Sequence, residues 1–223
     1  MTEAAGRPLL PAKPRLRGVC HQWAFFVSVV LGAALVVSAP AGVARLAAGV
    51  YALSVAGLFG ASALYHRITW ASAAARRWMR RVDHSMIFLL IAGSYTPFAL
   101  LVLDGTLATA ILVAVWTGAA VGVLLKLLWI DAPKWLASLT YVLLGWVAVA
   151  AYPDLLRELG ITATAMVTAG GVLYTLGALV YALRRPDPAP EVFGYHEVFH
   201  VLVIAAAALQ YAVVAFFVLP GAA

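Results

Sequence analysis

The residues best suited to chemistry are two histidines near the C-terminus, His196 and His200, four positions apart at the start of a long apolar run. On a helix, residues at this spacing lie on one face, one turn apart. Ionisable side chains are costly at the edge of a bilayer unless something uses them. A histidine pair at this spacing binds zinc in the zincin metalloproteases, although the pair alone is weakly specific. The pair predicts a metal site whose other ligands lie elsewhere in the chain.

The composition is that of an integral membrane protein. Of 223 residues, 65% are hydrophobic and only 11% are charged, whereas a soluble domain carries about a quarter charged residues. The net charge is +6, but the basic residues lie between apolar runs and form no aromatic-interleaved patch, so no nucleic-acid partner is expected. Cys20 is the single cysteine, which excludes an intramolecular disulfide and a cysteine-based zinc site.

Apolar runs of about 20 residues, the length that crosses a bilayer, predict an all-α integral membrane protein with a seven-helix transmembrane bundle over residues 19–219. Before it, residues 1–18 are polar and rich in proline and basic residues, and they predict a disordered basic cytosolic tail. The expected spans are 19–39, 44–66, 83–103, 106–128, 134–152, 161–183 and 195–219.

The distribution of lysine and arginine predicts the orientation of these spans. Thirteen of the 15 basic residues lie in the N-terminal tail and in the connections after the second, fourth and sixth spans. Only Arg45 and Arg157 lie on the opposite side. Since positive charge favours the cytosolic side, the N-terminus is predicted in the cytosol and the C-terminus outside.

This orientation brings residues from three distant spans to one depth. His66 ends the second span, Asp83 begins the third, and His196 begins the seventh; Ser62 and His200 each lie about 6 Å deeper, one helical turn away. Three histidines with one open position match the ligand set of a catalytic zinc. Asp83 then suits a general base or a hydrogen-bond partner of a ligand histidine, and Ser62 suits a hydrogen bond to the attacking water or to a substrate carbonyl.

Each of these residues also has a purely structural interpretation. His66 can be an interfacial histidine beside Arg67, Asp83 can pair with Arg80 or Arg76 on its own helix, and Ser62 can bond back to its helix. Three further polar residues at the span ends are not expected to take part in the site. His21 is interpreted as a headgroup-level residue, and Glu197 as an interhelical or loop contact. His84 is interpreted as interfacial, because it points about 100° away from Asp83.

Three motifs in these spans resemble the bacterial haemolysin III family, which groups with the progestin and adipoQ receptors, including the adiponectin receptors, and more distantly with the alkaline ceramidases. The motifs are Ser62-x-x-x-His66, Arg81-Val82-Asp83-His84-Ser85 with Ala92-Gly93-Ser94-Tyr95-Thr96-Pro97, and Gly194-Tyr195-His196-Glu197-Val198-Phe199-His200. One departure is Gln210, where many bacterial relatives are expected to have histidine.

The resemblance implies a seven-helix bundle in the bacterial plasma membrane with zinc near its cytosolic face. Its metal ligands would be His66, His196 and His200, with Asp83 and Ser62 as catalytic residues. The favoured function is a zinc-dependent hydrolase of lipid amide or ester bonds in membrane lipid homeostasis, with membrane lipids and a lipid substrate as partners. The alternative is a non-catalytic sensor of membrane state that uses structural zinc. An intramembrane serine protease at Ser62 is disfavoured because it needs one histidine, not three.

Overall fold

The computed structural model describes residues 13–222, and these form an all-helical bundle. Residues 1–12 of the predicted N-terminal tail and residue 223 lie outside the described residues. The α-helices are α1 (Val19–Ser38), α2 (Val43–Arg67), α3 (Ala73–Leu101), α4 (Gly105–Leu128), α5 (Lys134–Gly145), α6 (Tyr152–Leu183) and α7 (Tyr195–Val213). Shorter segments are the 3-10 helix η1 (Trp146–Ala151), the π-helix η2 (Val214–Val218) and the 3-10 helix η3 (Pro220–Ala222).

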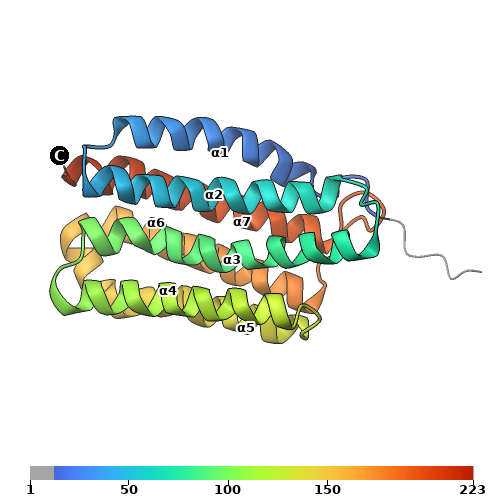
Figure 1. Ribbon diagram of the computed structural model, residues 1–223. Helices are drawn as coiled ribbons and strands as arrows, with labels where there is room; N and C mark the ends of the chain where they lie inside the picture. Colours follow the sequence, from blue (N-terminus) through green and yellow to red (C-terminus); the bar gives the residue numbers. More distant parts are fainter. Residues whose placement is uncertain (1–12, 223) are drawn as a thin grey trace, which may run out of the picture.

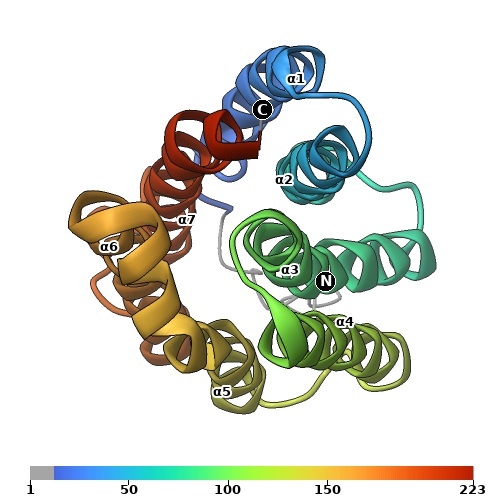
Figure 2. The same ribbon diagram turned by 90° about the vertical axis from the view of Figure 1, so that its left-hand side faces the viewer.

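The helices run along one axis and follow one another around the bundle in chain order (Figures 1 and 2). Each of α1 to α4 packs on the next, α5 packs on α6, α6 on α7, and α7 closes the circle against α1. The starts of α1, α3, α5 and α7 and the ends of α2 and α4 lie together at one end, on the right in Figure 1. We call this end, which contains His66 and His196, the histidine end.

Within residues 13–222, six helical stretches are long and apolar enough to cross a membrane. Five of them contain α1, α2, α3, α4 and α7, and the sixth is the continuous helical path Lys134–Leu183 of 50 residues. This path is broken within α6 at Gly160, whose φ of 75° and ψ of 175° are not helical. Glycine is suited to this position because it has no Cβ to clash at positive φ.

The helix boundaries differ from the sequence expectation mainly in the third span. It was expected from residue 83, but α3 begins at Ala73, where the Ser72 hydroxyl caps the helix by accepting a hydrogen bond from Ala75 N at 3.1 Å. The first turns of α3 are rich in arginine, and hydropathy detects only the apolar part that follows. The fifth helix also ends earlier than expected, because α5 changes to the 3-10 helix η1 after Gly145.

Pro97 lies inside α3 and cannot donate a backbone hydrogen bond. The helix nevertheless continues to Leu101, helped by Thr96, whose hydroxyl donates to the carbonyl of Ala92 at 2.9 Å. Trp116 of α4 donates to the same hydroxyl at 3.2 Å. The Thr96 hydroxyl beside the proline is thereby satisfied inside the bundle, as an apolar surrounding requires.

Close packing of α2 on α3 requires a glycine at position 93. A Cβ at Gly93 would lie 2.3 Å from Ser54 Oγ and 2.5 Å from Ser54 Cβ. Small residues at helix contacts allow such approach in membrane bundles. Because Ser54 is itself buried and its hydroxyl bonds to Tyr51 O at 2.7 Å, it has no free space into which to move.

We therefore expect Gly93→Ala to destabilise the protein by about 1–3 kcal/mol through overpacking, measured as a lower thermal unfolding midpoint in detergent. Gly49→Ala in α2 is the matched control, since no atom lies within 4 Å of its Cβ position. It should leave the midpoint unchanged or raise it, because alanine is the better helix former. Equal midpoints for both variants would contradict the packing argument.

Candidate metal centre

Three buried histidines from two helices meet at the histidine end of the bundle. His66 lies in the last turn of α2, and His196 and His200 lie in the first two turns of α7. Each contributes one ring nitrogen to a group in which all three atoms lie within 4.8 Å of one another. One pair, Nε2 of His66 and Nε2 of His196, is 3.1 Å apart. The residues predicted from the sequence as metal ligands are thus neighbours in space.

The dimensions of this group fit a zinc ion. Zinc binds histidine nitrogen at about 2.0–2.1 Å, so two nitrogens of a tetrahedral site lie roughly 3.4 Å apart. The 3.1 Å between Nε2 of His66 and Nε2 of His196 is near this spacing, and all three ligand atoms lie within 4.8 Å of one another. The donor set is also appropriate, because neutral imidazole is a preferred zinc ligand. Among the described residues, His200 Nδ1 is buried without a hydrogen-bond partner, which leaves a nitrogen of this ring free to bind.

Asp83 and Ser62, the predicted catalytic residues, lie at the same end and line one cavity with His196 and His200. Asp83 is buried, and its Oδ2 is 3.8 Å from His66 Nε2. Ser62 lies one turn before His66 on α2 and is also buried. Its hydroxyl lies 2.8 Å from a ring nitrogen of a histidine on α1, and among the bonds of the described residues none joins it back to its own helix. The arrangement therefore joins a carboxylate and a hydroxyl to the histidine group.

The alternative pairing of Asp83 with Arg80 or Arg76 on its own helix is not found among the described residues. Arg80 and Arg77 extend instead to Asp131 in the connection between α4 and α5, with Arg80 Nη1 at 2.9 Å from Oδ1. Asp131 lies outside the helices. Despite an opposing effect of desolvation, the charge of Arg77 and hydrogen bonds from Arg80 and Arg77 hold the pKa of Asp131 below its ordinary value. The carboxylate of Asp83 remains available to the site.

The position of His21 was predicted incorrectly. The residue is buried, with 2% of its surface exposed, rather than lying at headgroup level. Its Nδ1 is 2.8 Å from Ser62 Oγ, and its ring stacks on that of His200 with centroids 3.7 Å apart and planes at 11°. The sequence placed His21 at the correct end of the bundle, but the direction of its side chain depends on how α1 packs between α2 and α7.

His84 also lines the cavity, contrary to the expectation that it points away from the site. Its Nδ1 donates to the carbonyl of Arg80 at 2.9 Å, and Tyr181 OH lies 3.3 Å from its Nε2. Because a carbonyl only accepts, Nδ1 carries the proton and Nε2 accepts from the tyrosine hydroxyl. His84 Nδ1 is 3.6 Å from Asp83 Oδ2, so the ring lies beside the carboxylate but outside the metal-binding group.

Glu197 makes the loop contact expected for it. It is 1% exposed, and Arg17 donates to its Oε1 as an ion pair. Its Oε2 accepts from the backbone N of Gly194 at 2.9 Å, which caps the first turn of α7. The Glu197 carboxylate thus joins the segment before α1 to the start of α7, the helix on which His196 and His200 lie.

Residues 13–18 of the expected tail pack over the histidine end. Lys13 donates to the carbonyl of His66, which satisfies an end group of α2, and desolvation together with the charges of Arg67, Arg17 and Arg76 lowers the pKa of Lys13. Gly18 has a φ of 80°, and a Cβ there would lie 2.5 Å from His66 Cβ. The position requires glycine both for its backbone conformation and for the close approach.

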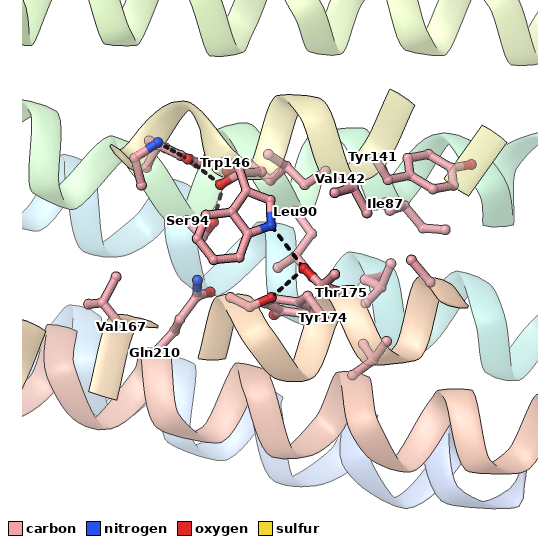
Figure 3. A pocket seen from close by; sticks show the side chains of 18 of the residues that line it. Ile87, Leu90, Ser94, Tyr141, Val142, Trp146, Val167, Tyr174, Thr175 and Gln210 are labelled. Carbon is pink, nitrogen blue, oxygen red and sulfur yellow. Dashed lines mark hydrogen bonds between the residues drawn. The ribbon is translucent and has the colours of Figure 1, made fainter. Parts of the chain in front are cut away.

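A cavity of about 200 Å³ extends from the histidines into the bundle (Figure 3). Its walls are mainly apolar residues of α3, α5, α6 and α7, among them Leu90, Val142 and Val167. An apolar cavity with a few polar groups gathered at one place is the usual form of a small-molecule site. This cavity has His196, His200, Asp83 and Ser62 at one end and mainly apolar walls beyond them.

A bundle of apolar helices with a polar cluster enclosed in it is a multi-pass membrane protein. Its sequence matches the family described as "Haemolysin-III related" over residues 11–211, and the chain therefore belongs to the haemolysin III family. It is 32% identical over 173 residues to "Hemolysin-3" of Bacillus cereus, covering 78% of this chain and 75% of that protein. It is 30% identical over 168 residues to "Hemolysin-3 homolog" of Bacillus subtilis, covering 75% of each.

A more distant relative connects the family to animal proteins. "Monocyte to macrophage differentiation factor" of Homo sapiens is 25% identical over 215 residues, covering 90% of this chain and 86% of that protein. This similarity supports the relation to the progestin and adipoQ receptor superfamily. The resemblance inferred from the three sequence motifs is confirmed.

We expect Arg17→Met to destabilise the protein by about 3 kcal/mol, because it leaves the buried carboxylate of Glu197 without its counter-charge. The measurement is the thermal unfolding midpoint in detergent. The double variant Arg17→Met/Glu197→Gln should recover most of the loss, since the buried charge is then removed. Arg157→Met is the control, because Arg157 is exposed and its ion pairs with Asp154 and Glu158 contribute little. Equal losses in Arg17→Met and Arg157→Met would contradict this role.

Proposed function

We propose that this protein is a zinc-dependent hydrolase of lipid amide or ester bonds in the plasma membrane of a bacterium. The observation that carries the proposal is the group of His66, His196 and His200, with ligand atoms within 4.8 Å of one another, beside Asp83 at the end of an apolar cavity. Three neutral ligands leave a fourth position open, as in catalytic zinc sites. The cavity suits an acyl chain, and membrane lipids are the available substrates.

The bound zinc ion supplies Lewis-acid chemistry, since it polarises a carbonyl and makes water more acidic. The three imidazoles hold the ion. Asp83 is buried next to them and serves as the base that accepts the proton of the attacking water and returns it to the leaving group. Ser62, in contact with His21, donates its hydroxyl to the carbonyl of the substrate, while the apolar walls orient its chain and exclude bulk water.

The second candidate is a sensor of membrane state with structural zinc. The distance of 3.8 Å between Asp83 Oδ2 and His66 Nε2 supports it, because a small movement would bring the carboxylate onto the metal as a fourth ligand. A closed four-ligand site is typical of structural zinc. The zinc would then fasten α2, α3 and α7 together. The two candidates differ in what Asp83 does.

We also propose that the chain crosses the membrane seven times, with its N-terminus in the cytosol. The path Lys134–Leu183 has 50 residues, roughly 75 Å of helix, whereas a bilayer core is about 30 Å thick. The break at Gly160 supports two crossings, before and after it. The basic residues gathered at the histidine end support a cytosolic position for that end.

Cysteine labelling in intact cells tests this topology. In a Cys20→Ser background, Pro188→Cys between α6 and α7 should be protected from a membrane-impermeant maleimide until the cells are permeabilised. Ala71→Cys should behave in the same way, and Asp104→Cys should react in intact cells. Reaction of Pro188→Cys in intact cells would contradict the seven-span arrangement, because a single crossing by residues 134–183 places this connection outside.

The function is tested by metal content and turnover of the purified protein. Wild type should contain nearly one zinc per chain, and His66→Ala and His200→Ala should lose both zinc and hydrolysis of an amide lipid such as ceramide. Asp83→Asn should retain zinc and lose about 10²–10⁴-fold in rate, because the amide accepts no proton. A sensor with Asp83 as a ligand loses zinc in this variant instead.

His84→Asn is the matched control, since His84 lies beside Asp83 but outside the metal-binding group. It should retain zinc. Zinc that persists in either His66→Ala or His200→Ala would refute the three-histidine site. Intact zinc binding without turnover of any amide or ester lipid would refute the hydrolase and leave the sensor.

A further inference from the structure

The cavity continues well beyond the histidines. On α7 its lining runs from His196 and His200 through Val203 to Gln210. The ten residues from His200 to Gln210 correspond to about 15 Å along a helix. Between these ends the walls are largely apolar, with residues such as Ile87, Leu90 and Phe98 from α3. A long lipid chain held at the histidines by its carbonyl end would thus reach the neighbourhood of Gln210.

Most polar side chains along the far part of this cavity have partners within the protein. The hydroxyls of four residues bond to backbone carbonyls: Ser94 to Ile91 at 2.8 Å, Thr164 to Gly160 at 2.9 Å, Thr168 to Thr164 at 2.8 Å and Thr175 to Gly171 at 2.8 Å. Trp146 donates to the Thr175 hydroxyl at 2.9 Å (Figure 3). These groups present a satisfied surface to an apolar chain.

Gln210 and Tyr174 are different. In the described part of the chain, Gln210 Oε1 and Tyr174 OH are buried atoms without a hydrogen-bond partner, and both residues line the cavity. Figure 3 includes them among its wall side chains. Ser138 of α5 also lacks a partner, but it lies in the second turn of α5, at the histidine end.

Helix packing brings these two residues to one region. Gly170 of α6 faces Gln210, because a Cβ at Gly170 would lie 3.6 Å from Gln210 Cγ. Tyr174 is four residues further along α6, on the same face and one turn nearer the histidine end. An acceptor from α7 and a hydroxyl from α6 therefore line the cavity within about one helical turn of each other.

We propose that this region binds a hydroxyl group on the chain of a lipid, about 15 Å from the carbonyl held at the histidines. A hydroxyl donates one hydrogen bond and accepts others, so it can give its proton to Gln210 Oε1 and accept from Tyr174 OH. An unsubstituted chain would leave both buried groups unpaired, which is costly. The inference rests on the proposed lipid ligand and narrows it to chain-hydroxylated lipids.

Binding to the detergent-purified, zinc-containing protein tests this without requiring turnover. Octadecanoic acid, 12-hydroxyoctadecanoic acid and 3-hydroxyoctadecanoic acid are compared by displacement of a fluorescent fatty acid. The 12-hydroxy acid places its hydroxyl far along the chain and should bind about tenfold more tightly than the unsubstituted acid. The 3-hydroxy acid, with its hydroxyl near the carboxyl end, should show no such gain.

Gln210→Leu and Tyr174→Phe should each reduce the preference for the 12-hydroxy acid to about one while the unsubstituted acid binds as before or more tightly. Ser94→Ala is the matched control, since its hydroxyl lines the same part of the cavity but is already bonded to Ile91 O. It should keep the preference.

Equal binding of the 12-hydroxy and unsubstituted acids by the wild type would overturn the proposal, and buried water would then satisfy Gln210 and Tyr174. A preference that persists in both variants, or no binding of any of these acids, would overturn it as well. Failure of the proposed function is distinguishable, because a protein that hydrolyses no lipid but prefers the 12-hydroxy acid refutes the hydrolase and supports this site.

Discussion

The whole architecture depends on the cost of enclosing ionisable side chains in a bundle of apolar helices. Such groups are stable there only when each finds a ligand, a hydrogen bond or an opposite charge. At the histidine end the buried ones are His21, His66, Asp83, Lys126, His196, Glu197 and His200. Since the partners of the histidines and carboxylates lie on α1, α2, α3 and α7, the requirement to satisfy them determines how these helices meet and explains why the chemistry gathers at one end.

The free-energy cost of these buried groups is offset in two different ways. Glu197 is neutralised within the protein, by Arg17 and by the backbone of Gly194, so it belongs to the framework that holds α7. Among the described residues, the carboxylate nearest the three histidines is that of Asp83, 3.8 Å from His66 Nε2. Their ring nitrogens face one another, which is the arrangement that a bound cation stabilises. The framework therefore holds together a set of nitrogen atoms that could bind a metal ion.

Two kinds of polar residue lie along the cavity, and they differ in whether their polar groups have partners. Serines and threonines on helices return their hydroxyls to the preceding turn, as Ser94 and Thr168 do, and so they border an apolar chain at little cost. Gln210 and Tyr174 are too long to bond within their own helices in this way. Their buried polar atoms give the far part of an otherwise apolar cavity a chemical preference.

Much of this could be predicted from the residues themselves. Hydropathy and the positions of lysine and arginine gave the helical membrane class and a common depth for His66, Asp83 and His196, because both depend on order along the chain. Rotation about each helix axis and helix contacts are decided by packing. Only the tertiary structure therefore shows that His21 packs on His200 and Ser62 and that Arg80 pairs with Asp131 instead of Asp83. It also shows that Gln210 faces the cavity. These outcomes depend on which surfaces, distant in the sequence, bury each other.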